Sequence, residues 1–285
     1  MASTHDYNMD TRNDNIHIYI NGFFFHRSEA KVSVMDSGYL LGDGVWEGIR
    51  LHKGTLIHLD AHLDRLFSGA KSIAMDIGLS CEEIILALRK TLEKNKMESD
   101  VHIRLIVSRG IKKTPYQHPK VTLGKPTVVI IPEYKKASED VKEKGITLAR
   151  VKTRRDHSIQ DPRINSLSKH NCIAACIEAD KLGADEGLML DPYDFVSTCN
   201  STNFFIVKNG EVWTSTGEYC LNGVTRGSII RLCEEYNIPI FEKNFNVEDV
   251  HSANEVFVTG TFAGVIPVPS VDGKTIGNGT RGSIT

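Results

Sequence analysis

The feature that most limits the fold of this chain is the order in which predicted strands and helices follow one another along the sequence. Residues 16–131 begin with a predicted hairpin at Ile16–Phe25, where β-branched and aromatic side chains flank Asn21-Gly22. Two amphipathic helices follow, for which Asp60 and Ser80 are the predicted N-caps. Further strands are predicted at Val32–Val34, Val45–Leu51, Val101–Ser108 and Thr127–Ile131. Strands, then helices, then strands predict an α+β domain rather than a doubly wound parallel sheet.

The second half of the chain has a similar mixture after a charged connection. Residues 132–144 carry many charges and few apolar side chains, which predicts a linker. Helices are predicted at about Asn171–Leu182 and after Gly223. Strands are predicted at Ile146–Thr153, Gly187–Leu190, Asn203–Lys208, Val212–Thr214, Pro239–Phe241, Val256–Thr259 and Val265–Val271. We therefore expect a flexible arm at 1–15, an N-terminal α+β domain at 16–131, the linker, and a C-terminal α+β domain at 145–285, with a cleft between the domains.

Charge and composition narrow the class of function. The 285 residues carry a formal net charge of −2, which gives no basic excess for nucleic acid or an anionic membrane surface. No run reaches the roughly 18 apolar residues that span a bilayer, and residues 1–15 do not resemble a secretory signal. We expect a cytoplasmic protein that acts on small molecules. The six cysteines form no CxxC pair, and Cys172 and Cys176 lack a histidine or carboxylate partner in register, so reduced thiols and no metal site are expected.

Three segments carry groups that bind phosphate. Asn222–Arg226 opens a predicted helix, whose free backbone N–H groups and dipole attract anions, and Thr225 adds a hydroxyl. Thr259-Gly260-Thr261 ends a predicted strand with similar small donor groups. Arg65 can make a charge-assisted contact from its helix. Taken singly, these features are also typical of an ordinary N-cap and a solvated arginine, but together they favour a phosphate-bearing ligand.

A series of motifs in fixed order resembles a known family. The motifs are Asp36-x-Gly38, Gly42–Arg50, His62-x-x-Arg65-Leu66, Gly183–Glu186, Asn203-Phe204-Phe205, Gly223–Arg226 and Gly260-Thr261. In order and spacing they resemble the class IV aminotransferases, the fold-type IV pyridoxal phosphate enzymes that include branched-chain and D-amino acid aminotransferases and aminodeoxychorismate lyase. The resemblance implies two α+β domains with pyridoxal 5'-phosphate between them, a homodimer, and an amino acid and a 2-oxo acid as substrates.

The resemblance also implies roles for single residues. The positions that match the cofactor's phosphate cup are Arg65, Val224, Thr225, Gly260 and Thr261. Trp46 and Arg50 match positions that line the substrate pocket. Arg104 and Arg109 resemble the carboxylate-binding arginines of the branched-chain and the D-amino acid groups, respectively. Because they are five residues apart on or just past one predicted strand, at most one of them is expected to point into the pocket.

Two positions depart from the family pattern. Counting back from Glu178-Ala179 places Asn165 where the family has its Schiff-base lysine, and the nearest lysine is Lys169, four residues on. Thr198 stands five residues before Asn203, where the family has the carboxylate that pairs with the pyridine nitrogen of the cofactor. An asparagine cannot provide the amine or shuttle a proton. A threonine hydroxyl can only hydrogen-bond to the ring, which weakens the cofactor as an electron sink.

Three readings of this chain remain open. In the first, a rebuilt helix start lets Lys169 reach the cofactor, and the chain is an aminotransferase for a small branched-chain or D-amino acid. In the second, the phosphate cup holds pyridoxal phosphate or another phosphate ligand without transamination, either noncovalently or for an altered reaction such as that of a lyase. In the third, Lys169 is a solvated surface residue and the chain is a non-catalytic binding protein. Because relatives usually continue into a last helix, we also expect a truncated C-terminus after Thr285.

Overall fold

The computed structural model describes residues 10–285, and these fall into two compact units. The first unit comprises residues 10–136 and 164–169, and the second comprises 137–163 and 170–285. The predicted arm lies partly outside the described residues. Its last part forms the 3-10 helix η1 (Thr11–Asn15), where the Asn13 amide exchanges two hydrogen bonds with the backbone of Tyr134.

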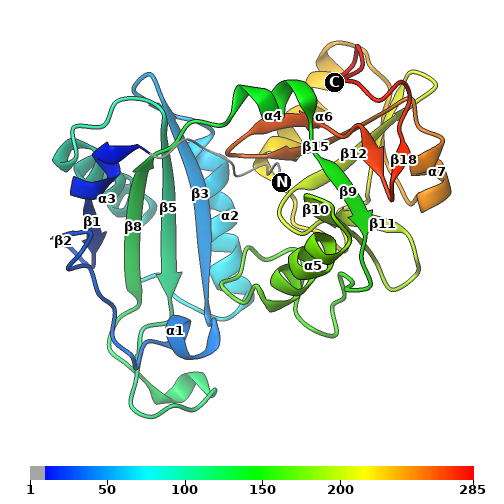
Figure 1. Cartoon of the computed structure of the whole chain (residues 1–285). Helices are drawn as coiled ribbons and strands as arrows, with labels where there is room; N and C mark the ends of the chain where they lie inside the picture. Colours follow the sequence, from blue (N-terminus) through cyan, green and yellow to red (C-terminus); the bar gives the residue numbers. More distant parts are fainter. Residues whose placement is uncertain (1–9) are drawn as a thin grey trace. The chain divides into compact units, whose positions relative to one another are not determined.

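The first unit is built on a six-stranded antiparallel sheet in the order β2-β1-β8-β5-β3-β4 (Figure 1). Its strands are β1 (His17–Ile20), β2 (Phe23–His26), β3 (Gly44–His52), β4 (Thr55–Leu56), β5 (Val101–Ser108) and β8 (Thr127–Tyr134), and β6 (Ile111–Lys112) and β7 (Thr122–Leu123) form a separate ribbon. The predicted hairpin is confirmed, because β1 pairs with β2 across Asn21-Gly22. The predicted strand at Val32–Val34 is wrong: both valines are exposed, and this segment has no partner strand.

Two helices cover one face of this sheet and bury its apolar side chains. The helices of the unit are α1 (Ser37–Leu41), α2 (Leu59–Ser72), α3 (Cys81–Lys94) and the 3-10 helix η2 (Pro119–Val121). The predicted Ser80 cap is confirmed as a capping box with Glu83. Asp60 is not the cap of α2, because the N-cap is His58 and the helix begins at Leu59, one residue before Asp60. Asp60 instead lies in the first turn, where its charge complements the helix dipole.

The second unit contains two five-stranded sheets of mixed pairing. One has the order β11-β10-β9-β17-β18 and the other β14-β13-β12-β15-β16. Their strands are β9 (Thr147–Arg150), β10 (Glu186–Leu190), β11 (Val196–Cys199), β12 (Asn203–Lys208), β13 (Glu211–Thr214), β14 (Ile240–Glu242), β15 (Glu255–Gly260), β16 (Gly264–Pro267), β17 (Ser270–Val271) and β18 (Lys274–Thr275). Their helices are α4 (Glu139–Lys144), α5 (His170–Lys181), α6 (Val224–Glu235) and α7 (Val247–His251). The sequence analysis missed β11, whose polar residues are nevertheless all buried.

The connections between the units differ from the predicted linker at 132–144. Strand β8 continues to Tyr134 and α4 begins at Glu139, so only residues 135–138 lie outside helices and strands. The chain then returns to the first unit at residues 164–169. Within residues 10–285 no helix combines the length and the apolar character that a membrane crossing requires.

Residues 164–169 join the first unit along the edge of β3. The Leu167 N–H donates to the Gly44 carbonyl at 2.9 Å, and the Trp46 N–H donates to the Asn165 carbonyl at 3.0 Å. A Cβ atom on Gly44 would lie 2.7 Å from Leu167 Cδ1, so glycine makes room for the leucine. Backbone pairing and this packing hold Asn165 beside Trp46.

Candidate active site

Strand β3 separates two groups of functional side chains. Because side chains alternate along a strand, Glu47 points into the core, whereas Trp46 and Arg50 lie on the other face. Arg104, opposite Gly48 on β5, places its guanidinium 4.1 Å from the centre of the Trp46 ring. This distance is typical of a cation–π contact. Trp46 and Arg104 therefore form one surface on the outer face of the sheet.

Asn165 and Lys169 lie next to this surface. The Asn165 side chain is buried, and its Nδ2 donates to the Trp46 carbonyl at 2.7 Å. The Lys169 ammonium donates to Asn165 Oδ1 at 3.2 Å and lies 5.6 Å from the centre of the Trp46 ring. Lys169 is therefore neither remote from position 165 nor fully solvated. The Lys169 amine is therefore joined to the Asn165 side-chain amide by a single hydrogen bond.

On the inner face, Glu47 joins two residues of α2. It is fully buried and accepts two hydrogen bonds from Arg65, at 2.8 and 2.7 Å, and one at 2.7 Å from His62 Nδ1. Burial opposes ionisation of this carboxyl, but these hydrogen bonds outweigh it and hold the pKa of Glu47 below its ordinary value. The ion pair with Glu47 fixes the orientation of Arg65, whose side chain remains 17% exposed.

The other two predicted substrate-binding arginines have different surroundings. Arg109 donates to both carboxylate oxygens of Asp43 and to the carbonyls of Ile73 and Ala74, at 2.7–3.0 Å. These bonds tie the end of β5 to the end of α2. Arg50 lies four residues, or about 13 Å, along β3 from Trp46, with its Nη2 4.0 Å from Asp100. Of these arginines, Arg104 shares a neighbour with Lys169, since both lie over the Trp46 ring.

In the second unit, the start of α6 presents free backbone donors. Helix α6 is twelve residues long, and its N-cap Gly223 offers no side chain to the first turn. A Cβ atom on Gly223 would lie 2.1 Å from Asn203 Oδ1, so only glycine fits. Asn203 Nδ2 in turn donates to the Leu221 carbonyl at 2.8 Å. The Asn203 motif therefore positions the loop that leads to Val224 and Thr225.

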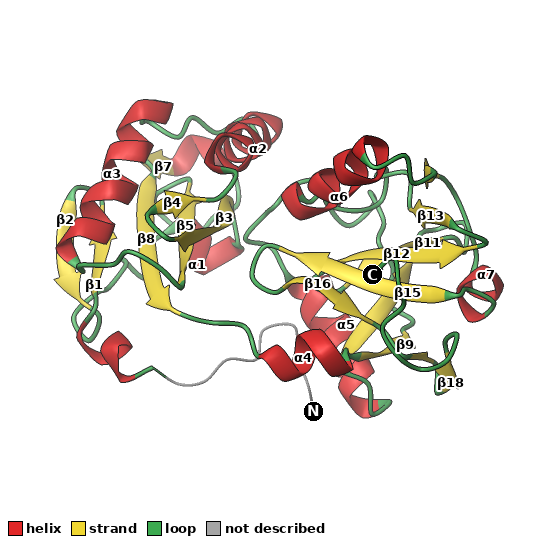
Figure 2. Ribbon diagram, turned by 90° about the horizontal axis from the view of Figure 1, so that it is seen from above, coloured by secondary structure: helices red, strands yellow, loops and turns green. Residues whose placement is uncertain are grey.

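The end of β15 lies beside this loop. Thr259 pairs with Asn203 across β12 and β15, which run side by side in Figure 2. The Thr259 side chain is buried, and its Oγ1 has no hydrogen-bond partner among the described residues. A buried hydroxyl without a partner is costly, so a ligand that accepts its hydrogen bond would be favoured here. Gly260 and Thr261 follow directly.

No carboxylate replaces the family's glutamate at position 198. Thr198 is buried and donates its hydroxyl proton to the Thr202 carbonyl at 2.7 Å. The carboxylate that reaches this loop is Glu186, which accepts hydrogen bonds from Ser201 and from the Thr202 hydroxyl. Burial and the Glu186 charge raise the pKa of Cys199 well above its ordinary value, so this neighbour of Thr198 is a protonated packing residue.

Arg155 is a buried cation that the sequence analysis did not single out. It is 7% exposed, and its Nε has no hydrogen-bond partner within residues 10–285. Its charge opposes the rise in the pKa of Cys199, which places it near β11. Two adjacent arginines in a polar run give no periodic signal, so only the tertiary contacts reveal that Arg155 is buried.

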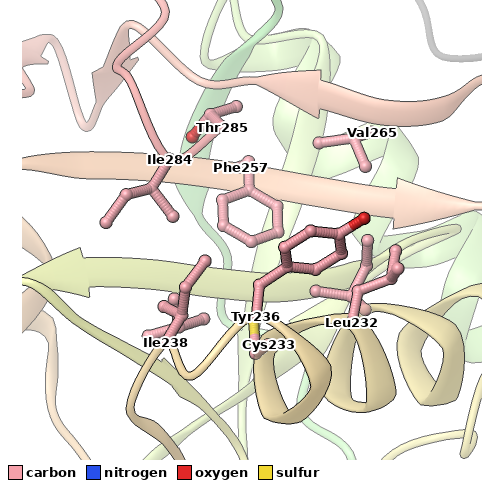
Figure 3. A pocket seen from close by; sticks show the side chains of 10 residues that line it. Leu232, Cys233, Tyr236, Ile238, Phe257, Val265, Ile284 and Thr285 are labelled. Carbon is pink, nitrogen blue, oxygen red and sulfur yellow. The ribbon is translucent and has the colours of Figure 1, made fainter.

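The second unit also contains an apolar pocket of about 190 Å³ (Figure 3). It is lined by Val212, Ile229, Leu232, Cys233, Tyr236, Ile238, Phe257, Val265, Ile284 and Thr285. Glu255 accepts three hydrogen bonds from Ile284 and Thr285, which hold that segment at the pocket. The lining brings together no charged group, so this pocket is not the candidate site. Among residues 10–285 no cluster of three metal-ligating side chains occurs.

The polar groups of the second unit suit the phosphate end of pyridoxal phosphate better than its pyridine end. The open helix start and the unpartnered Thr259 hydroxyl suit its phosphate. Lys169 offers an amine beside position 165. Position 198 offers no carboxylate to the pyridine end, and the Thr198 hydroxyl already donates to the Thr202 carbonyl.

Comparison with known proteins identifies relatives along most of the chain. The family model for amino-transferase class IV matches residues 44–271. A putative branched-chain-amino-acid aminotransferase of Methanocaldococcus jannaschii is 40% identical over 94% of this chain and 92% of its own length. The branched-chain-amino-acid aminotransferase-like protein 1 of Arabidopsis thaliana is also 40% identical, over 91% of this chain, but the chain spans only 47% of that protein.

A solved structure shows the same fold. The branched-chain amino acid aminotransferase of Escherichia coli superimposes with a TM-score of 0.88 at 28% identity, covering 95% of this chain and 91% of that one. The fold class predicted from the sequence is therefore confirmed.

Proposed function

Because this chain belongs to the class IV aminotransferase family, we propose that it is a pyridoxal-phosphate-dependent aminotransferase in which Lys169 replaces the lysine absent at position 165. Its substrates would be a small branched-chain or D-amino acid and a 2-oxo acid. The relatives' names support this class, since they include branched-chain and D-alanine aminotransferases. A cytoplasmic homodimer belongs to the same proposal.

One observation carries this proposal. The Lys169 amine lies 3.2 Å from Asn165 Oδ1, so it ends beside the side chain that stands at the family's lysine position. Asn165 is itself fixed by its bond to the Trp46 carbonyl. Asn165 is thus a positioning residue, and Lys169 supplies the amine that an asparagine cannot.

The remaining residues bind and orient. In the second unit, Val224, Thr225, Gly260 and Thr261 would donate to the phosphate. In the first unit, Arg65, oriented by Glu47, would add a positive charge. Arg104 on the Trp46 ring binds the substrate carboxylate, because Arg109 is engaged by Asp43 and two backbone carbonyls. When bound, the cofactor supplies an electrophilic aldehyde and an electron sink. Lys169 would be the residue that holds the cofactor at its aldehyde end and that moves the substrate proton.

Thr198 favours a second candidate function. Without a carboxylate at the pyridine nitrogen the electron sink is weaker, which suits a protein that binds pyridoxal phosphate or another phosphate ligand without transamination. Such a protein is stabilised by the ligand and shows no turnover with an amino donor. An altered reaction, such as that of a lyase, is distinguished by its products.

Borohydride reduction tests the role of Lys169. Purified protein is incubated with pyridoxal 5'-phosphate, reduced, digested and analysed by mass spectrometry. We expect the adduct on Lys169, together with transamination of a branched-chain or D-amino acid. Lys169→Ala should abolish the adduct and lower kcat at least about 100-fold, as loss of a covalent catalytic group does.

Two controls make this test specific. Lys181→Ala alters an exposed lysine at the end of α5 and should leave the adduct and turnover unchanged. Asn165→Ala should lower kcat about tenfold with little change in KM, because Lys169 loses one hydrogen bond that positions it. The proposal fails if no adduct forms on Lys169 and Lys169→Ala retains full turnover.

A further inference from the structure

A buried lysine lies outside the candidate active site, on the β6–β7 ribbon of the first unit. Lys112 is 1% exposed and is among the largest fully buried side chains of the described chain. Its ammonium donates to the His118 carbonyl at 3.4 Å, the long limit of a hydrogen bond. Within residues 10–285 no carboxylate lies within 4.0 Å of this ammonium. Burial of a charge with so little compensation is costly.

A second buried polar group faces Lys112 across the ribbon. Thr122 pairs with Lys112 in the register of β6 and β7, so both side chains project to the same side. Thr122 Oγ1 is buried and has no hydrogen-bond partner among the described residues. A positive charge and a hydroxyl group without an acceptor among the described residues therefore project from paired positions of one ribbon.

The neighbouring polar groups are already engaged. Asp36, whose backbone bridges to Ile111, accepts from the Gly38 N–H at 2.8 Å and from the Ser108 hydroxyl at 2.9 Å. The ring of His118 accepts from the Lys120 N–H at 3.1 Å. These groups account for their own hydrogen bonds, so the long bond to the His118 carbonyl is the compensation that the described residues give to the Lys112 charge.

We propose that Lys112 and Thr122 form a binding site for a small inorganic anion, with chloride as the abundant candidate. The ammonium supplies the charge, and the Thr122 hydroxyl donates the second hydrogen bond. This site stabilises the ribbon and is independent of the proposed transamination.

Thermal unfolding in two sodium salts tests the site. Sodium gluconate is exchanged for sodium chloride at constant ionic strength, so that screening stays the same. We expect the Tm of the wild-type chain to rise with chloride and to saturate, as binding to the folded state requires. In Lys112→Met this rise should disappear. The Tm of Lys112→Met in gluconate should equal or exceed that of the wild type, because an apolar side chain replaces a charge with little compensation.

Two further variants separate the site from general salt effects. Lys113→Met removes a neighbouring exposed lysine and should keep the chloride response. Thr122→Val keeps the charge but removes the hydroxyl, so half-saturation should need about tenfold more chloride. If Lys112→Met does not fold, crystals of the wild type grown in bromide provide a direct test, since an anomalous peak is expected at hydrogen-bonding distance from the Lys112 ammonium.

Two results would overturn the anion site. One is an equal chloride response in the wild type and in Lys112→Met, together with no bromide peak beside Lys112. The other is a stability that depends on protein concentration but not on chloride, which would assign the missing acceptor to a carboxylate of a second copy.

Discussion

Glu47 shows how a single buried charge stays ionised inside the first unit. The carboxylate has no contact with water, yet Arg65 and His62 supply three hydrogen bonds to its two oxygens. Their effect exceeds the cost of burial, so the pKa of Glu47 lies below its ordinary value. A group whose pKa is lowered by folding stabilises the folded state while it is ionised.

The pH dependence of stability should therefore depend on Glu47. Its contribution is fully present above the unfolded-state pKa of about 4.3 and is lost as the pH falls through the lower folded-state pKa. Glu47→Gln should cost about 3 kcal/mol near pH 7, since it leaves Arg65 without its carboxylate. When the free energy of unfolding is measured against pH, its decrease at acidic pH should also be less steep in Glu47→Gln. The exposed Glu93→Gln serves as the control, and an unchanged decrease at acidic pH in Glu47→Gln would contradict this account.

Single residues also decide the chemistry at position 165. The spacing of motifs places Asn165 and Thr198 at the two anomalous positions from the sequence alone. The reach of Lys169 depends on the path of residues 164–169 along β3, which is set by backbone bonds to Gly44 and Trp46. The residues around position 165 in the sequence do not indicate these partners, because the partners lie far away along the chain.

At the scale of elements, the start of α6 depends on one close approach. Gly223 has an ordinary negative φ of −64°, so its role is steric rather than conformational. Any Cβ atom there would collide with Asn203, whose amide holds the preceding loop. The free N–H groups of Val224 and Thr225 depend on this fit.

Two glycine substitutions in this region should therefore have opposite effects. Gly223→Ala should displace Asn203, destabilise the chain by about 1–3 kcal/mol, and weaken binding of pyridoxal phosphate. Gly227→Ala, inside the same helix, meets only Arg231 at 3.7 Å and should stabilise α6 by up to about 1 kcal/mol. Denaturant unfolding measures both changes. Equal effects of the two substitutions would show that the contact with Asn203 is unimportant.

Elements with clear local sequence signals were predicted well, whereas elements that depend on pairing with distant strands were not. The hairpin at Asn21-Gly22 and the Ser80 cap follow from local turn and capping chemistry. Strand β11 was missed because its polar residues show no alternation, although pairing with β10 buries them. The run at Val32–Val34 has strand-like residues but no partner, so it remains irregular.

At the scale of the whole molecule, the residues proposed to hold the cofactor are divided between the units. Arg65 and Lys169 belong to the first unit, and Thr225 and Thr261 belong to the second. Each unit has its own hydrophobic core.

Ligand-induced stabilisation tests the role proposed for Arg65. Pyridoxal 5'-phosphate at 100 times its Kd should raise the free energy of unfolding of the wild type by about 2.7 kcal/mol. Arg65→Ala should remove most of this ligand-dependent gain, although it also lowers the stability of the free chain by breaking the pair with Glu47. Arg89→Ala, an exposed arginine on α3, should keep the gain. Thermal shift with and without ligand gives the comparison, and an undiminished gain in Arg65→Ala would exclude this role for Arg65.

The sequence by itself determined the family, the α+β character of both halves, and the two substituted positions, because motif order and hydrophobic period are properties of the linear chain. Only the tertiary structure decided which unit holds residues 164–169, that Arg109 is engaged by Asp43 while Arg104 lies on Trp46, and that the Lys169 amine lies beside Asn165. It also revealed that Lys112 is buried. These facts depend on contacts between distant segments, and such contacts are set by packing and pairing rather than by local residue preference.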